Sequence, residues 1–189
     1  MIYLYGWNSV SEFILDELEG DGLSVDGIIV DDQYIDGLIY PEVLNLIPAS
    51  KACFNSRDQV YNCLGYKNLQ QRIQIGDRLI DLGVLQKFIS NKAVIHSAVT
   101  IDAGAVLLGD VVIERNSHIG KHCLLWGGSR ICHDSVLGHG VFLASGSIIG
   151  GACIVGNMCS LGFNSSLREK CQLPTGTKVG ANRFWKPQR

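Results

Sequence analysis

The sequence is poor in several features that mark particular classes of protein. Acidic and basic residues nearly cancel, with a formal net charge of −2 at pH 7, so nothing indicates a nucleic-acid partner or an acidic membrane surface. No apolar run approaches the roughly 20 residues of a transmembrane helix, and the first residues lack the basic segment of a signal peptide. We therefore expect a cytoplasmic protein that neither binds nucleic acid nor inserts into a membrane.

The seven cysteines contain no C-x-x-C pair, so neither a disulfide framework nor a zinc knuckle is expected. Four of them recur at one position of a repeat, where cysteine serves as a small apolar side chain. These four are Cys123, Cys153, Cys159 and Cys171. The pattern assigns no role to Cys53, Cys63 and Cys132.

That repeat is the main feature of the chain. An aliphatic residue recurs every six positions from Ile95 to Val179, and the residue two positions before it is small or β-branched. A period of six belongs neither to an α-helix nor to a single strand. It is typical of hexapeptide repeats in a parallel β-helix, where each repeat supplies one short strand and one turn.

Every third repeat carries a similar aliphatic residue, as in the series Ile95, Ile113, Ile131 and Ile149. This sorting predicts a triangular prism of about five coils, with like residues stacked about 4.8 Å apart. Glycine often follows the aliphatic residue directly, and there we expect a tight corner that a Cβ atom would obstruct. These glycines are Gly120, Gly138, Gly150, Gly156, Gly162 and Gly180.

The first 90 residues predict a small α/β domain, followed by the repeats at 91–181 and a tail at 182–189. Strands are expected at 1–6, 28–30, 60–64 and 85–90, and helices at 10–20, with Ser9 or Ser11 as its cap, and about 67–82. Residues 33–50 are expected to form a loop with a short helix.

The order of strand, glycine turn, helix, strand and acidic residues is that of the start of a nucleotide-binding α/β unit. Gly6 and the N–H groups of Asn8 and Ser9 would hold a diphosphate at the helix start. Asp31 and Asp32 would bind ribose or base. Since the turn is not a full G-x-G-x-x-G fingerprint, a purely structural unit with the acids in a solvated turn is the alternative.

His133 is the candidate catalytic residue. It lies at a predicted corner two residues after the inward Ile131, and the equivalent position one coil later is Gly151. The missing side chain leaves a notch above the imidazole and exposes the Gly151 N–H. Asp134 would select the tautomer of the imidazole and strengthen it as a general base.

The other histidines are expected to be polar surface residues at turns: His96, His118, His122 and His139. Carbonic anhydrases with a β-helix bind zinc through three histidines. A metal site needs all its ligands to converge, and an N-terminal α/β domain has no place in such an enzyme, so no metal is expected.

The segment from Ile131 to Gly138 matches the pattern I-x-H-(D/E)-C-x-I-G, except for Ser135 and Leu137. With the α/β domain and the unbroken repeat, the chain resembles, over nearly its whole length, bacterial acyltransferases that acetylate nucleotide-linked amino sugars. These include the enzymes of bacillosamine and perosamine synthesis and the related sialic-acid O-acetyltransferases.

The resemblance implies a left-handed β-helix, a homotrimer, and acetyl-CoA in the groove between neighbouring prisms. It also implies that the N-terminal domain holds the nucleotide sugar next to a histidine of the adjoining prism. Trp126 stands where many family members have Asn, and Phe142 where some have a His near the cofactor. In the family Gly65 marks a loop bordering the nucleotide site; a simple turn is the alternative.

The function expected is acetyl-CoA-dependent N-acetylation of a nucleotide-linked amino-deoxy sugar, by direct attack in a ternary complex. His133 acts as general base, Asp134 supports it, and the Gly151 N–H binds the oxyanion. The base is left open among uridine, thymidine and guanosine. The alternatives are O-acetylation of a free sugar such as sialic acid, or a non-catalytic scaffold that binds a nucleotide sugar.

Overall fold

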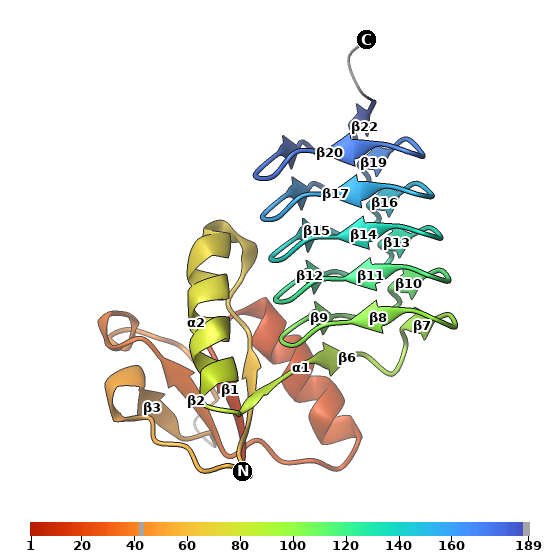
Figure 1. The fold of residues 1–189 in the computed structure, drawn as a ribbon. Helices are drawn as coiled ribbons and strands as arrows, with labels where there is room; N and C mark the ends of the chain where they lie inside the picture. Colours follow the sequence, from red (N-terminus) through yellow and green to blue (C-terminus); the bar gives the residue numbers. More distant parts are fainter. Residues whose placement is uncertain (42–43, 187–189) are drawn as a thin grey trace. The chain divides into compact units, whose positions relative to one another are not determined.

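The computed structural model describes residues 1–41 and 44–186. The chain divides into two compact units, Met1–Gln86 and Lys87–Arg189 (Figure 1). Within the described residues, no helix is both long enough and apolar enough to cross a membrane. The same residues contain no group of three or more His, Cys, Asp or Glu side chains that could hold a metal ion.

The N-terminal unit, as described at 1–41 and 44–86, is built on a five-stranded parallel sheet in the order β3-β2-β1-β4-β5. The strands are β1 Ile2–Tyr5, β2 Gly27–Val30, β3 Leu46–Pro48, β4 Gln59–Asn62 and β5 Leu85–Gln86. Helix α1 (Ser9–Gly20) connects β1 to β2, and α2 (Leu69–Asp81) connects β4 to β5. Short 3₁₀ turns lie at η1 Asp32–Tyr34, η2 Ala49–Lys51 and η3 Tyr66–Asn68.

Helix α1 begins with a cap different from the one predicted. Asn8 is the N-cap: its Oδ1 accepts from the Val10 N–H at 2.8 Å, and its own N–H donates to Ser11 Oγ at 2.7 Å. This reciprocal arrangement satisfies N–H groups that the helix leaves unpaired. Ser11 therefore takes part in the cap from inside the helix.

Strand β3 was not predicted, because the segment 33–50 carries prolines and no clear alternation. Residues Leu46 and Ile47 pair with Ile28 and Ile29 of β2, and Pro48 ends the strand. β3 is an edge strand of this sheet. A proline is tolerated there because no further strand pairs with it and needs its missing N–H.

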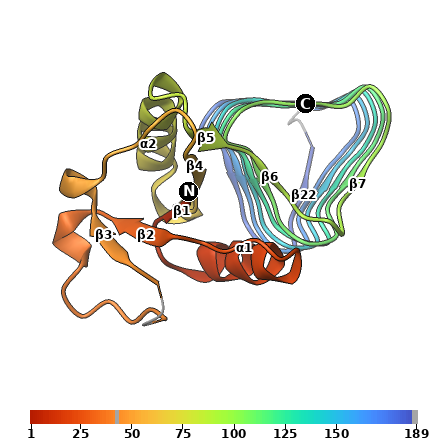
Figure 2. The same ribbon diagram turned by 90° about the horizontal axis from the view of Figure 1, so that it is seen from below.

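The second unit, as described at 87–186, is a three-sided prism of two-residue strands (Figure 2). The first sheet contains β7 Val94–Ile95, β10 Val112–Ile113, β13 Arg130–Ile131, β16 Ile148–Ile149, β19 Ser166–Leu167 and β22 Phe184–Trp185. The second contains β8 Thr100–Ile101, β11 His118–Ile119, β14 Val136–Leu137, β17 Ile154–Val155 and β20 Gln172–Leu173. The third contains β6 Phe88–Ile89, β9 Val106–Leu107, β12 Leu124–Leu125, β15 Phe142–Leu143, β18 Ser160–Leu161 and β21 Lys178–Val179.

All strands of the prism pair in parallel with the strand 18 residues away, so that Ile113 lies over Ile95 and under Ile131. The inward aliphatic residues form one continuous buried core, together with the four cysteines predicted to face inward. The parallel β-helix and its three stacks are therefore confirmed.

The prism extends beyond both predicted ends. The strand expected at 85–90 is divided: β5 belongs to the N-terminal sheet, and β6 belongs to the prism. At the other end, β22 adds a strand within the predicted tail. Ile89 and Trp185 both fall on the six-residue register, so one further step of the repeat at each end predicts these two strands.

The corners reveal what the repeat requires of the backbone. In the described part of the chain, nine non-glycine residues have positive φ, and each lies three positions after an inward aliphatic residue. The glycines directly after the aliphatic residue do not make this turn. A Cβ at Gly120 would lie 2.7 Å from the carbonyl carbon of Gly138, so glycine is needed there because consecutive coils approach closely.

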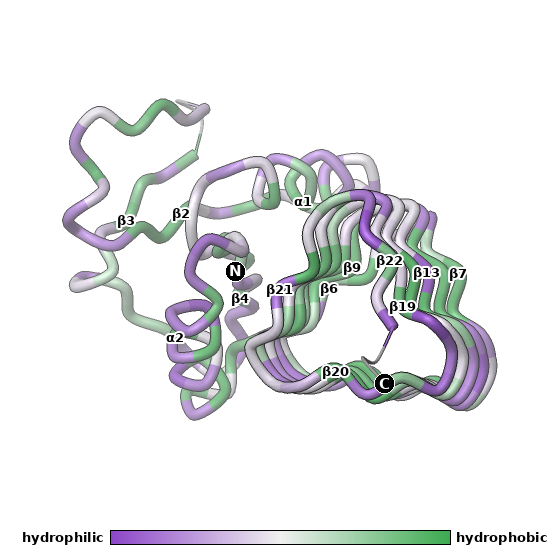
Figure 3. The backbone as a smooth tube through the Cα atoms, turned by 90° about the horizontal axis from the view of Figure 1, so that it is seen from above, coloured by the Kyte–Doolittle hydropathy of each residue, from purple (hydrophilic) through white to green (hydrophobic). Residues whose placement is uncertain are grey.

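The prediction that His122 is a surface residue is wrong. His122 has positive φ (60°) at a corner, but it is only 1% exposed, and its N–H donates to the Ala103 carbonyl at 3.1 Å. A position at a corner therefore does not by itself expose a side chain. Hydrophilic residues gather instead at the corner that follows β7 and β13 (Figure 3).

Candidate functional site

His133 and Asp134 form a hydrogen-bonded pair at the corner that follows β13. Nδ1 of His133 lies 2.7 Å from Oδ2 of Asp134, and both side chains are about half exposed. The other oxygen of Asp134 accepts from Nδ2 of Asn116, one coil earlier, at 3.0 Å. The hydrogen bond from Asn116 lowers the pKa of Asp134 most, and the bond with His133 lowers it further. An ionised carboxylate on Nδ1 favours the tautomer with the proton there, which leaves the Nε2 lone pair to accept a proton.

Gly151 lies against the free nitrogen of that imidazole. A Cβ atom at Gly151 would lie 2.9 Å from Nε2 of His133 and 3.0 Å from Cε1, so the notch predicted from the sequence is present. The Gly151 carbonyl accepts from the Lys170 N–H at 2.8 Å. Its own N–H has no acceptor within the described residues.

Polar side chains that the sequence analysis missed hold this corner in place. Oε2 of Glu114 accepts from the backbone N–H of His133 at 3.1 Å, and Oε1 lies 3.7 Å from Nη1 of Arg130. Inside the prism, Ser135 Oγ donates to the Gly150 carbonyl at 3.0 Å. Glu114 lies 19 residues before His133, and Asn116 lies 18 residues before Asp134. Since one coil has 18 residues, this spacing could have identified both residues from the sequence.

Trp126 and Phe142 do not join His133 at this corner. Trp126 directly follows β12, so β13 separates it from His133 along the coil. Phe142 is in β15, one strand above β12, and is 6% exposed.

The N-terminal unit has a pocket at the carboxyl ends of β1, β2 and β4. In the strand order of this sheet the connections reverse direction between β1 and β4, which is where α/β sheets bind ligands. The pocket contains three of the predicted substrate-binding residues: Gly6, Asn8 and Asp31. Its other lining residues are Tyr5, Trp7, Val30, Tyr34, Leu38 and Leu64.

The N–H groups predicted to hold a diphosphate are only partly available. Gly6 donates its N–H to the Ile29 carbonyl at 2.7 Å, and the cap of α1 uses that of Asn8. The N–H groups of Trp7 and Ser9 have no acceptor within residues 1–41 and 44–186. The sequence analysis missed Trp7 because it placed the cap at Ser9 or Ser11 and therefore left the Asn8 N–H available.

The two acids after β2 have different surroundings. Asp31 accepts from the Tyr5 hydroxyl at 2.6 Å and from Nε2 of Gln71 at 2.9 Å. Burial and the bond to Asp31 raise the pKa of Tyr5, so its hydroxyl stays a donor. Asp32 instead accepts from both the N–H and the hydroxyl of Ser50, which lowers the pKa of Asp32.

Asp32 therefore holds η2 in place through Ser50 and does not face the pocket that contains Asp31. Gly65 is the residue before η3, and a Cβ there would meet nothing within 4 Å. Neither residue lines the pocket that contains Asp31.

Comparisons with known proteins agree with this fold. The model of the family described as "Bacterial transferase hexapeptide (six repeats)" matches residues 116–151, the segment that contains Asn116, His133, Asp134 and Gly151. No curated protein matches the chain.

Several solved structures are similar over almost the whole chain. The acetyltransferase domain of PglB from Neisseria gonorrhoeae has a TM-score of 0.85 at 17% identity, covering 98% of this chain and 90% of that one. PerB from Caulobacter crescentus, in complex with CoA and GDP-perosamine, has a TM-score of 0.85 at 21% identity, covering 99% and 89%. WeeI from Acinetobacter baumannii has a TM-score of 0.71 at 20% identity, covering 96% and 97%. The chain thus carries bacterial-transferase hexapeptide repeats on a fold that it shares with these acetyltransferase structures.

Proposed function

We propose that this protein is an acetyl-CoA-dependent N-acetyltransferase that modifies the amino group of a nucleotide-linked amino-deoxy sugar. The observation that carries the proposal is the arrangement of His133, whose Nε2 lies beside the Gly151 backbone while Nδ1 is held by Asp134. The shared fold supports it, because PerB has been solved with CoA and GDP-perosamine.

The chemistry follows from the positions of these groups. The sugar amine attacks the thioester carbonyl of acetyl-CoA directly, forming the C–N bond, and Nε2 of His133 accepts the proton that the nitrogen loses. The carbonyl electron pair moves to oxygen, where the unpaired Gly151 N–H stabilises the negative charge. Collapse of the tetrahedral intermediate breaks the C–S bond, and the imidazolium returns the proton to the CoA thiolate.

In this proposal the N-terminal unit binds the nucleotide sugar. The N–H groups of Trp7 and Ser9 at the start of α1 would hold the diphosphate. The carboxylate of Asp31 would accept from a ribose hydroxyl, because its two hydrogen bonds to protein leave lone pairs available. Asp32 and Gly65 would act by shaping neighbouring loops.

The prism would be left-handed and would assemble as a trimer, with acetyl-CoA between neighbouring prisms, near Trp126 and Phe142. Val136 and Ile154 support assembly, since they lie one above the other on the second sheet and are 41% and 51% exposed. Contiguous apolar surface of this kind marks contact sites. Light scattering that shows a monomer at micromolar concentration would contradict the trimer. Placement in the cytoplasm is part of the same proposal.

The decisive experiment measures thiol release from acetyl-CoA with a panel of nucleotide-linked amino sugars and with free sialic acid. We expect release with an amino sugar, and we expect His133→Asn to lower kcat by about 10²–10⁴-fold. His96→Asn is the matched control, because His96 is an exposed histidine of the same prism. Release with sialic acid alone would indicate O-acetylation, and binding without release would indicate a scaffold.

A further inference from the structure

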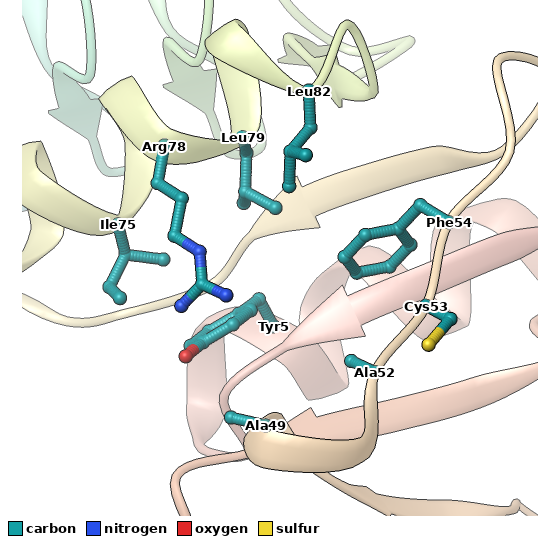
Figure 4. A pocket seen from close by; sticks show the side chains of 9 residues that line it. All are labelled: Tyr5, Ala49, Ala52, Cys53, Phe54, Ile75, Arg78, Leu79 and Leu82. Carbon is teal, nitrogen blue, oxygen red and sulfur yellow. The ribbon is translucent and has the colours of Figure 1, made fainter.

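The N-terminal unit has a second pocket that the reaction at His133 does not use (Figure 4). It has a volume of about 280 Å³ and lies between α2 and the chain that follows β3, with Tyr5 of β1 at its base. One wall consists of Ile75, Arg78 and Leu79 of α2 and of Leu82 directly after it, and the opposite wall of Ala49, Ala52, Cys53 and Phe54.

The lining combines apolar and aromatic surface with one positive charge. Tyr5 and Phe54 contribute rings, and the guanidinium of Arg78 is directed towards Tyr5 (Figure 4). Within the described residues that guanidinium has no hydrogen bond or ion pair. A planar donor group beside aromatic rings suits a flat ligand that presents an oxygen acceptor in the plane of its ring.

The second pocket shares one lining residue with the first. Tyr5 lines both of them, and its hydroxyl donates to Asp31, the proposed ribose ligand. Asp32, the next residue, holds Ser50 and thereby fixes η2, whose Ala49 begins the far wall. A nucleotide with its ribose at Asp31 would therefore have its next group, the base, beside this pocket.

We propose that the second pocket receives the base of the nucleotide sugar, and that this base carries a ring carbonyl which accepts from Arg78. The base stacks on the ring of Phe54. Uracil, thymine and guanine carry such a carbonyl, whereas adenine does not. The inference rests on the proposed function, since it names one part of the same substrate.

Calorimetric titration of the full chain with UDP, dTDP, GDP and ADP tests the inference without any turnover. We expect at least one keto-base diphosphate to bind about ten-fold more tightly than ADP, as a charge-assisted hydrogen bond allows. In Arg78→Met this preference should vanish while ADP affinity stays unchanged. Arg57→Met removes an exposed arginine outside both pockets and should keep the preference.

Phe54→Ala provides a second variant, and it should weaken binding of every base by about ten-fold through lost stacking. Equal affinity of the native protein for ADP and the other diphosphates would overturn the inference, as would a preference that survives in Arg78→Met. If the native protein still releases thiol with a nucleotide-linked amino sugar, only the base site is refuted. If no diphosphate binds and no thiol is released, the proposed function fails as well.

Discussion

Gly150 and Gly151 are neighbours in the sequence, yet the structure predicts opposite effects when each is replaced by alanine. A Cβ at Gly150 would lie 2.6 Å from the backbone nitrogen of Glu169 and 2.8 Å from the carbonyl oxygen of Leu167. Both atoms belong to the backbone of the next coil. A Cβ at Gly151 would meet only the imidazole of His133 so closely, at 2.9 Å from Nε2.

The size of each effect follows from what must move. Backbone of the next coil cannot give way without disturbing the parallel ladder, so Gly150→Ala should lower the free energy of unfolding by about 1–3 kcal/mol. The half-exposed imidazole of His133 can turn aside, so Gly151→Ala should leave stability nearly unchanged. Turning aside stretches the 2.7 Å bond between Nδ1 and Asp134, and a displaced base should lower kcat at least about ten-fold, or about 1.4 kcal/mol.

Two measurements on both variants separate these outcomes. Urea unfolding gives the change in stability, and thiol release at saturating concentrations of both substrates gives kcat. The reasoning is refuted if Gly151→Ala keeps the kcat of the native protein, because the imidazole would then not react at the Gly151 notch. A Gly150→Ala variant as stable as the native protein would show that the coils can separate more easily than their contacts indicate.

Four further outcomes are expected. Asn116→Ala should raise the lowered pKa of Asp134 towards 3.8, as read by NMR titration, and should cost less kcat than Asp134→Ala, for which about ten-fold is expected. Since the pKa of Asp134 is lowered by folding, its stabilising effect is present above pH 3.8 and is lost as the pH falls through the lowered value. Asp31→Ala should weaken calorimetric binding of the nucleotide sugar and leave acetyl-CoA binding unchanged; equal loss of both would assign Asp31 to structure. The exposed Cys53 should react promptly with a disulfide reagent, whereas burial raises the pKa of the Cys63 thiol to about 12, so Cys63 should react only on unfolding.

The prism could be predicted because one physical requirement repeats along it. Each coil places the same side-chain position on the coil below, so a residue such as Ile131 must match Ile113 and Ile149 in kind. The same translation predicts Gly151 over His133. The histidines were predicted less well. His118 lies in strand β11 rather than at a turn. His122 is at a corner but buried, because the register fixes where a residue lies on the coil and not how much of its corner is covered.

Less of the N-terminal unit could be predicted from the sequence, because its contacts join segments that share no repeating pattern. Strand β3 is short, ends in Pro48 and is recognisable only from its pairing with β2. The cap of α1 could have been found, because Asn8 and Ser11 form a local capping box. The contact of the Asn8 side-chain amide with the Cys63 carbonyl, just after the neighbouring strand β4, could not. A contact between residues so far apart in the chain leaves no local pattern.

The prism separates the residues that stabilise it from those that carry the proposed chemistry. Its core consists of inward residues such as Ile131 and Ile149, which are fully buried, and burial of their apolar surface is the main stabilising contribution. His133 and Asp134 lie at a corner, are half exposed and contribute nothing to that core. Their replacement should therefore change the reaction without unfolding the coil. The boundary between the two roles falls between Gly150, which faces backbone, and Gly151, which faces the imidazole.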